Sequence, residues 1–429
     1  MSEIGERRAT PASPVASGRG LDGRLVVLAI LAAYFALVAL PRALFDVDLW
    51  PRLGVPAEDT LFYDARNVAA AADCRRLGHD PLVDNPCDPT DRPMIYPRLW
   101  LLLRFLGLQQ SHTTLFGGAV VLLFLVSVLF LVGRLTVRQG IFVAAALCSP
   151  AVMFAVERAN MDLVLFSMLV LAVFAWQARS APVQLLSPAL VLVAAAAKLY
   201  GVFALPAFAL TGQRRGRWIA AGSLAVLAVY VAATIDDVAK VGRAPEGGLL
   251  YSYGARILIG HLYHQVVPGE WQAGTAVAQA IAAIPLLVLL SAVWVWARRR
   301  LGPGGPLEPD AHGGALLAFH FGVLIYLGTF ATRKNGDYRL VFLLLTIPQL
   351  LVWASSTVGA PRTRLARAGL GTVLAALWIG ALSPYIGPAD ELASWAVAGT
   401  FVALLAASVP PLRPRRGAVL PEQTHRRTP

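Results

Sequence analysis

Acidic side chains gather in one stretch of an otherwise apolar chain. Ten of the 25 Asp and Glu residues lie between positions 46 and 91. Two of them, Asp59 and Asp64, belong to the aromatic-rich segment "DTLFYDAR". A carboxylate beside an acceptor hydroxyl can take its proton as the hydroxyl attacks, which is general-base catalysis. We interpret these two residues as alternative catalytic bases, and Asp59 is favoured.

A second set of polar residues interrupts the apolar segments further along the chain. Ionisable residues near membrane depth are costly and indicate function by default. Lys and Arg at that depth suit a lipid phosphate. The alternative is a set of internal ion pairs, such as Glu157 with Arg158 or Lys198. The groups are Glu157, Arg158, Asn160 and Asp162 in "ERANMD", Lys198 in "AAKLYG", and Arg333, Lys334, Asp337 and Arg339 in "RKNGDYRL".

Long apolar runs must position these residues. The chain is 57% hydrophobic with a mean hydropathy of +0.62, and runs of about 17 to 25 apolar residues are typical of membrane-spanning helices. The sequence predicts an all-α polytopic membrane protein with about 12 spans, in a range of 10 to 13. The expected spans are 25–45, 113–133, 139–156, 161–177, 183–198, 199–212, 217–234, 274–297, 313–332, 338–356, 366–386 and 392–410. The short pair 183–212 is also compatible with a re-entrant segment.

The distribution of charge gives the predicted orientation. The net charge of +12 invites a nucleic-acid reading, but topology explains it better, because Lys and Arg concentrate in alternate short loops. We therefore expect no nucleic-acid partner. Both termini are predicted inside, with basic tails at 1–24 and 411–429 flanking one transmembrane domain, 25–410. The loop 46–112 then lies outside.

This large loop is predicted to carry interfacial helices. The segment "TLFYDARNVAAAADCRRL" has helical apolar spacing after Asp59 as its N-cap, and residues 96–108 form a second candidate. Cys74 and Cys87 share the loop and an oxidising compartment, so a disulfide is expected, with two free thiols as the alternative. The histidines are scattered and show no metal-ligand spacing. The sequence predicts no metal site and no cofactor.

The order of these motifs resembles the multi-spanning glycosyltransferase C superfamily. It is most similar to the bacterial branch of polyprenyl-phosphate-mannose-dependent mannosyltransferases, which carry "YY..AR", "G..PY…YPP", "ERGN.D" and "KLYP". This chain has "DTLFYDAR", "GHDPL…IYPRLW", "ERANMDLVLF" and "AAKLYGVFALP" in the same order. It departs in "YPR" for "YPP", in "ERAN" for "ERGN", and in a proline displaced to Pro206.

The resemblance implies an active site on the outer face of the bacterial inner (plasma) membrane. It implies a polyprenyl-phosphate sugar as donor, an envelope glycan or glycolipid as acceptor, and membrane lipid as surroundings. Asp59 aligns with the family's catalytic acid, and Asp64 is its rival. The resemblance also implies two sets of binding residues. The donor phosphate would be bound by Lys198, Arg333, Lys334, Arg339 and Arg158. The sugar or acceptor pocket would be formed by Tyr63, Arg66, Tyr96, Arg98, Glu157, Asn160 and Asp337.

Two other functions stay open at this point. A transporter or flippase of lipid-linked sugars would be indicated by internal symmetry and a midplane cavity open to both sides. A non-catalytic partner in an envelope-assembly complex would be indicated if Asp59 and Asp64 both pointed away from any cavity. No internal symmetry is visible, and the polar residues cluster towards one face, which favours the transferase.

Overall fold

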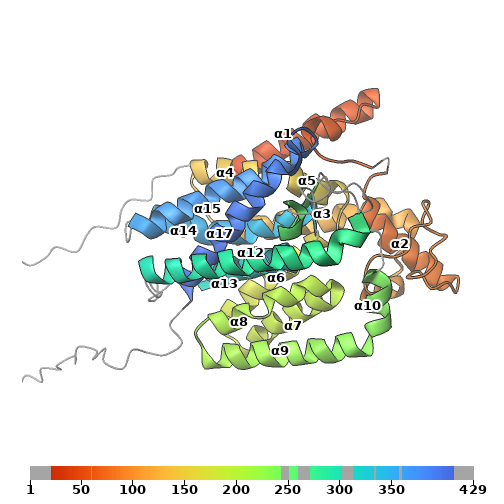
Figure 1. Cartoon of the computed structure of the whole chain (residues 1–429). Helices are drawn as coiled ribbons and strands as arrows, with labels where there is room; N and C mark the ends of the chain where they lie inside the picture. Colours follow the sequence, from red (N-terminus) through yellow and green to blue (C-terminus); the bar gives the residue numbers. More distant parts are fainter. Residues whose placement is uncertain are drawn as a thin grey trace, which may run out of the picture.

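The protein is a bundle of helices in this computed structural model (Figure 1). The structure describes residues 21–58, 60–242, 251–258, 271–301, 313–332, 335–356 and 360–409. Two short strands, β1 (Ser252–Tyr253) and β2 (Asn335–Gly336), pair antiparallel.

Helices make up nearly all of the regular structure. The longer ones are α1 (Gly23–Phe45), α2 (Tyr63–Arg76), α3 (Thr113–Val132), α4 (Val137–Leu147), α6 (Asp162–Gln177), α7 (Ala181–Ala197), α9 (Arg214–Ala233), α12 (Trp271–Arg300), α13 (Gly313–Thr332), α15 (Ala360–Ile379) and α17 (Glu391–Ser408). The shorter ones are η1 (Pro51–Leu53), η2 (Arg98–Leu106), η3 (Gln110–His112), α5 (Pro150–Glu157), η4 (Leu199–Ala204), α8 (Ala207–Leu210), α10 (Ile235–Gly242), η5 (Asp337–Thr346), α14 (Ile347–Ser355), η6 (Gly380–Leu382), α16 (Ser383–Ile386) and η7 (Gly387–Asp390).

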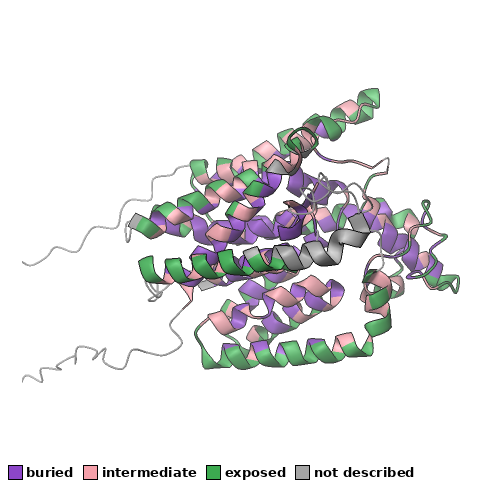
Figure 2. Ribbon diagram, in the orientation of Figure 1, coloured by how far each residue is buried: buried purple, intermediate pink, exposed green. Residues whose placement is uncertain are grey.

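The helices have the length and composition of a membrane protein. Within the described ranges, seven are long and apolar enough to cross a bilayer, or eight if the bent pair α4 and α5 counts as one span. Exposed faces of outer helices such as α1 and α9 (Figure 2) carry large apolar side chains, including Leu40, Leu44, Val226 and Val229. The predicted class, an all-α membrane protein, is confirmed.

Four predicted spans are not continuous α-helices. The span 366–386 divides into α15, η6 and α16, and the other three break near a proline. The span 139–156 divides into α4 and α5, which are bent by 57°, and Pro150 starts α5. The span 199–212 becomes η4 and α8, with Pro206 at the break. The span 338–356 becomes η5 and α14, with Pro348 in the first turn of α14. Proline lacks the N–H that would continue the preceding helix and fits the first turn of the next one.

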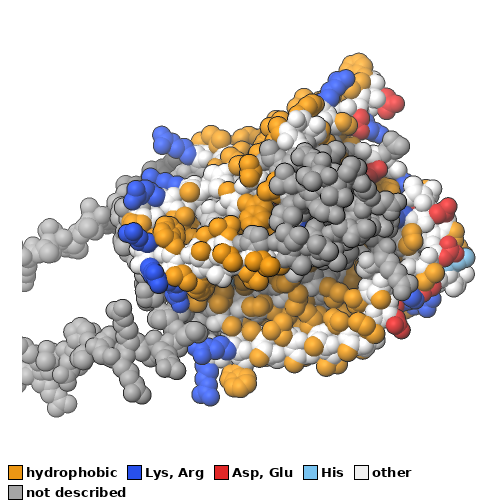
Figure 3. Space-filling model, viewed as in Figure 1, with side chains coloured by type: hydrophobic (Ala, Val, Ile, Leu, Met, Phe, Trp, Pro, Cys, Tyr) orange, Lys and Arg blue, Asp and Glu red, His pale blue; other side chains and the backbone are white. Residues whose placement is uncertain are grey.

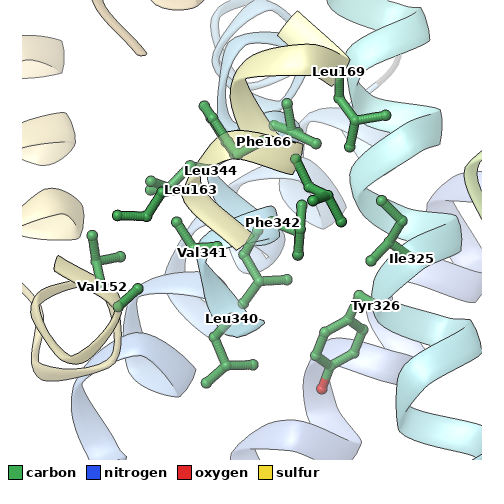
Figure 4. Close-up of a cluster of buried hydrophobic side chains, with 14 of the residues drawn as sticks. Val152, Leu163, Phe166, Leu169, Ile325, Tyr326, Leu340, Val341, Phe342 and Leu344 are labelled. Atoms are coloured by element: carbon green, nitrogen blue, oxygen red, sulfur yellow. The ribbon is translucent and has the colours of Figure 1, made fainter. Parts of the chain in front are cut away.

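The centre of the bundle is closely packed. Figure 4 shows side chains of η5 meeting Phe166 of α6 and Tyr326 of α13. The backbones of α13 and η5 approach closely at Gly322. A Cβ atom added there would lie 2.8 Å from the Phe342 carbonyl oxygen, so glycine is needed at this contact. In lipid, such packing and internal hydrogen bonds hold helices together more than apolar burial does.

Charged side chains lie at two opposite ends of the helical body. On the face drawn in Figure 3, Lys and Arg line the end where α12 finishes in three arginines, and most Asp and Glu lie near α2 and α10. Hydrophobic side chains predominate in the coloured part of the band between these two ends. We call the end that carries α2 and α10 the acidic end.

The large loop folds around α2 at the acidic end. Its second predicted helix is the 3₁₀ segment η2. The expected N-cap of α2 is wrong, because the residue before Tyr63 is Phe62, in a left-handed conformation with φ 59°. The N–H of Phe62 donates to the carbonyl of Glu157 at 3.0 Å, and these contacts set the start of the helix. Asp64 therefore lies in its first turn, where the helix dipole favours an anion.

Cys74 and Cys87 form the expected disulfide, with Cα atoms 5.6 Å apart. Replacing both by Ser is expected to lower the thermal unfolding midpoint, since closing a loop of this length stabilises by roughly 3 kcal/mol in the chain-entropy model. Thermal unfolding of the purified protein, with and without reductant, measures the shift. Cys148→Ala is the control, because Cys148 is buried and unbonded. Equal midpoints for the wild type and the double variant would contradict the prediction.

Candidate functional site

A chain of polar side chains joins three separate elements at the acidic end. The Asn160 side-chain amide donates to Asp64 Oδ2 at 2.6 Å, and its carbonyl oxygen accepts from Lys198 Nζ at 2.9 Å. Asp64 lies on α2, Asn160 in the turn between α5 and α6, and Lys198 at the end of α7. Three predicted site residues that are far apart in sequence are thereby brought together.

Asp162 is the second centre of this network. Its carboxylate is fully buried and accepts hydrogen bonds from Lys198 and from the Tyr200 hydroxyl. Arg339 reaches it from η5, with Nε 3.8 Å from Asp162 Oδ2. The predicted phosphate-binding residues Lys198 and Arg339 therefore converge on one carboxylate.

Asp64 is held by cations as well as by Asn160. Its Oδ1 lies 3.3 Å from Arg92 Nη1 and 3.5 Å from Arg158 Nη1, and the residue is 2% exposed. Arg158 also pairs with Glu58. A buried carboxylate is tolerated where such partners compensate its charge. The internal ion pairs considered from the sequence thus exist, with different partners from those expected.

The "ERAN" turn positions two members of the network. The carbonyl of Arg158 accepts from the backbone N–H of Asp64 at 3.1 Å, which ties the turn to α2. Ala159, between Arg158 and Asn160, is fully buried and has φ 42°. This left-handed conformation favours glycine, which the resembling family carries at the same point of its motif.

Ala159→Gly is expected to keep the fold and to match or exceed the wild-type thermal midpoint. A left-handed residue with a Cβ costs roughly 1–2 kcal/mol, whereas glycine costs about 0.4–1 kcal/mol through the unfolded chain. Ala159→Val should destabilise, because a β-branched side chain fits this conformation poorly. Thermal midpoints of the three proteins give the order, and a glycine variant less stable than the valine variant would refute it.

Arg92 belongs to the site although no pattern in the sequence indicates it. Besides its ion pair with Asp64, it donates from Nη2 to the Tyr63 carbonyl at 2.9 Å. Its own carbonyl accepts from the side chains of Asn67 at 3.2 Å and Asn85 at 3.0 Å. In the sequence Arg92 lies among turn residues, and only the folding of the loop brings it beside α2.

Two other predicted pocket residues border the network. Tyr96 is 1% exposed, and Lys198 Nζ lies 4.9 Å from the centre of its ring. Glu157 is 2% exposed and accepts from the N–H of Glu58 at 3.4 Å. Asp337 is also buried, but its carboxylate lies against Gly380. A Cβ atom added at Gly380 would be 2.6 Å from Asp337 Oδ2.

Arg98 does not join the network. It donates to Asp80 and to Asp237 at 2.8 Å each, and Lys240 donates to Asp80 at 3.1 Å. The hydrogen bond from Arg98 lowers the pKa of Asp80 to about 2, so this pair weakens only as pH falls towards that value. Arg98 therefore links η2 to α10, and its place in a sugar pocket stays a prediction.

Three of the predicted site residues, Asp59, Arg333 and Lys334, lie outside the described residues. Among the described residues, no cluster of His, Cys, Asp and Glu could hold a metal ion.

Several buried polar atoms in the network or beside it have no hydrogen-bond partner among the described residues. They are Arg66 Nε, Arg92 Nε, Tyr96 Oη, Glu157 Oε2, Arg158 Nε, Asp162 Oδ2 and Arg339 Nε. Unsatisfied buried polar groups are rare and call for an explanation. One explanation is that they belong to a functional site. The arrangement combines cations able to bind an anion with carboxylates able to accept a proton.

The fold and site define a helical membrane protein with a buried network of Lys, Arg, Asp and Asn at its acidic end. No family model, curated protein or solved structure matches the chain.

Proposed function

We propose that the protein is a membrane glycosyltransferase that moves a sugar from a polyprenyl-phosphate donor to an envelope glycan or glycolipid. The observation that carries the proposal is the meeting of Lys198 and Arg339 at Asp162, linked through Asn160 to Asp64. This network lies at the end of an apolar bundle, where a lipid phosphate and its chain could both be accommodated.

Each group has a role in the proposed reaction. The acceptor hydroxyl attacks the anomeric carbon, its proton passes to a carboxylate, and the bond from that carbon to the phosphate oxygen breaks. The phosphate leaves with the electron pair, and Lys198 and Arg339 stabilise its charge. Nearby carboxylates favour the oxocarbenium-like transition state.

Asp59 remains our first candidate for the base. Asp64 is 2% exposed, and both of its oxygens are engaged by Arg92, Arg158 and Asn160. These contacts suit a residue that holds cations in place better than one that meets an acceptor. Asp64 is the alternative base if this division of roles fails.

We further propose that the acidic end faces outwards across the bacterial inner membrane, with both termini inside. Arginines near the ends of α9, α12 and α15 at the opposite end support this orientation. The order of helices along the chain also supports the proposal. The seven candidate spans, the bent pair of α4 and α5, the three shorter apolar helices and α12 lie at the positions of the twelve predicted spans.

Purified full-length protein in lipid nanodiscs, incubated with polyprenyl-phosphate sugars and an envelope lipid extract, tests the function. Transfer should yield a new glycosylated product and free polyprenyl phosphate, both visible by mass spectrometry. Movement of intact donor across a vesicle bilayer, without loss of its sugar, would instead support a flippase.

A further inference from the structure

Three arginines surround a single tyrosine ring at the start of α2. The guanidinium carbon lies 3.9 Å from the centre of the Tyr63 ring in Arg92, 5.2 Å in Arg158 and 5.8 Å in Arg66. Distances up to about 6 Å allow cation–π attraction. One aromatic ring therefore helps to hold three like charges close together.

These arginines have donor capacity that the protein leaves unused. The Nε atoms of Arg66, Arg92 and Arg158 are buried and have no acceptor among the described residues. The Asp88 carboxylate lies 3.9 Å from Arg92 Nε, too far for a hydrogen bond. The Arg66 guanidinium forms no ion pair with any described residue. Leaving a buried donor unsatisfied is costly, so three such donors together indicate an anionic acceptor other than the described residues.

This cluster is separate from the proposed donor site. Lys198 and Arg339 contact Asp162, whereas Arg92 and Arg158 contact Asp64. Asn160 bridges the two groups, with one side-chain atom bonded to each. One lipid phosphate on the Lys198 side would leave the arginine cluster available for a second anion.

We infer that Arg66, Arg92 and Arg158 form a second anion subsite, which binds a phosphate carried by the acceptor. The inference rests on the proposed function, and it moves Arg158 from the donor site to the acceptor site. Guanidinium groups bind phosphate oxygens through paired hydrogen bonds. Because Tyr63 directly precedes Asp64, an acceptor anchored here would lie beside this alternative base.

Native mass spectrometry of the full-length protein in detergent tests the subsite with two probes. Citronellyl phosphate represents the donor phosphate, and dioctanoyl phosphatidylglycerol represents a phosphate-bearing acceptor. The wild type should bind one of each at the same time. The double variant Arg66→Gln/Arg92→Gln should bind phosphatidylglycerol at least about tenfold more weakly, as expected for lost charge-assisted hydrogen bonds. It should bind citronellyl phosphate as before.

Two controls separate the inference from the proposed function. Lys198→Met should lose citronellyl phosphate and keep phosphatidylglycerol, the reverse pattern. Arg75→Gln, an exposed arginine on the same helix, should change neither. If neither probe depends on Lys198, the donor site fails. If the two probes compete, or the double arginine variant keeps its phosphatidylglycerol affinity, the second subsite is overturned.

Glycerol phosphate identifies the source of the acceptor phosphate. Displacement of phosphatidylglycerol by glycerol phosphate would indicate a soluble phosphorylated glycan. Retention of the lipid against excess glycerol phosphate would indicate a lipid-anchored acceptor. Both results support the subsite, provided that binding depends on Arg66 and Arg92.

Discussion

Asp59→Asn is expected to lower the rate of sugar transfer about 100- to 10,000-fold, the usual loss for a general base. Asparagine has the same shape but cannot take the acceptor proton. The variant should still be expressed, fold and bind the donor lipid. Steady-state transfer assays with the purified variant, together with citronellyl phosphate binding, separate the lost chemical step from lost binding.

Asp64→Asn is the matched comparison. Removing this buried charge leaves Arg92 and Arg158 less compensated, so the thermal midpoint should fall while the loss of rate is milder than for Asp59→Asn. If Asp59→Asn keeps wild-type turnover and folded Asp64→Asn is inactive, Asp64 is the base. If both variants stay active, the base lies elsewhere, and Glu157 or Asp337 is the next candidate.

Lys198→Met is expected to abolish donor binding and also to destabilise the protein. Lys198 is 8% exposed and Asp162 is fully buried, so the substitution leaves the carboxylate with only the Tyr200 hydroxyl and the more distant Arg339 guanidinium to compensate it. Breaking a buried ion pair in this way costs about 3–5 kcal/mol. Thermal unfolding and citronellyl phosphate binding measure the two effects separately.

The double variant Lys198→Met/Asp162→Asn distinguishes a functional lysine from a structural one. Removing both charges should restore much of the stability, because the two residues are directly coupled. Donor binding should stay lost, since the cation is still missing. Recovery of donor binding along with stability would show that Lys198 only neutralises Asp162.

The sequence predicted the helices better than their interruptions. Apolar run length is a local property, so α1, α3, α9 and α13 fall where expected. The breaks at Pro150, Pro206 and Pro348 depend on whether neighbouring helices can satisfy the freed backbone groups. The apolar pattern alone does not reveal this, because proline is also tolerated inside membrane helices, as Pro188 is in α7.

Site residues were predictable where a polar residue interrupts an apolar run. Asn160, Lys198 and Arg339 stand out for this reason, and the structure brings them together around Asp162. Arg92 and Glu58 lie in a loop already rich in charge, where no single residue is conspicuous. Their roles depend on long-range contacts fixed by the disulfide, the Asn67 hydrogen bonds and the conformation of Phe62. The expected cap at Asp59 was wrong because that conformation has no sequence signature.

A cryo-electron microscopy structure of the protein in nanodiscs with bound polyprenyl phosphate tests the central claim most directly. The proposed function predicts density for the phosphate within hydrogen-bond distance of Lys198 or Arg339, with the prenyl chain running along the apolar surface. Phosphate density only at the opposite, arginine-rich end, with Lys198 and Arg339 still paired to Asp162 alone, would contradict it.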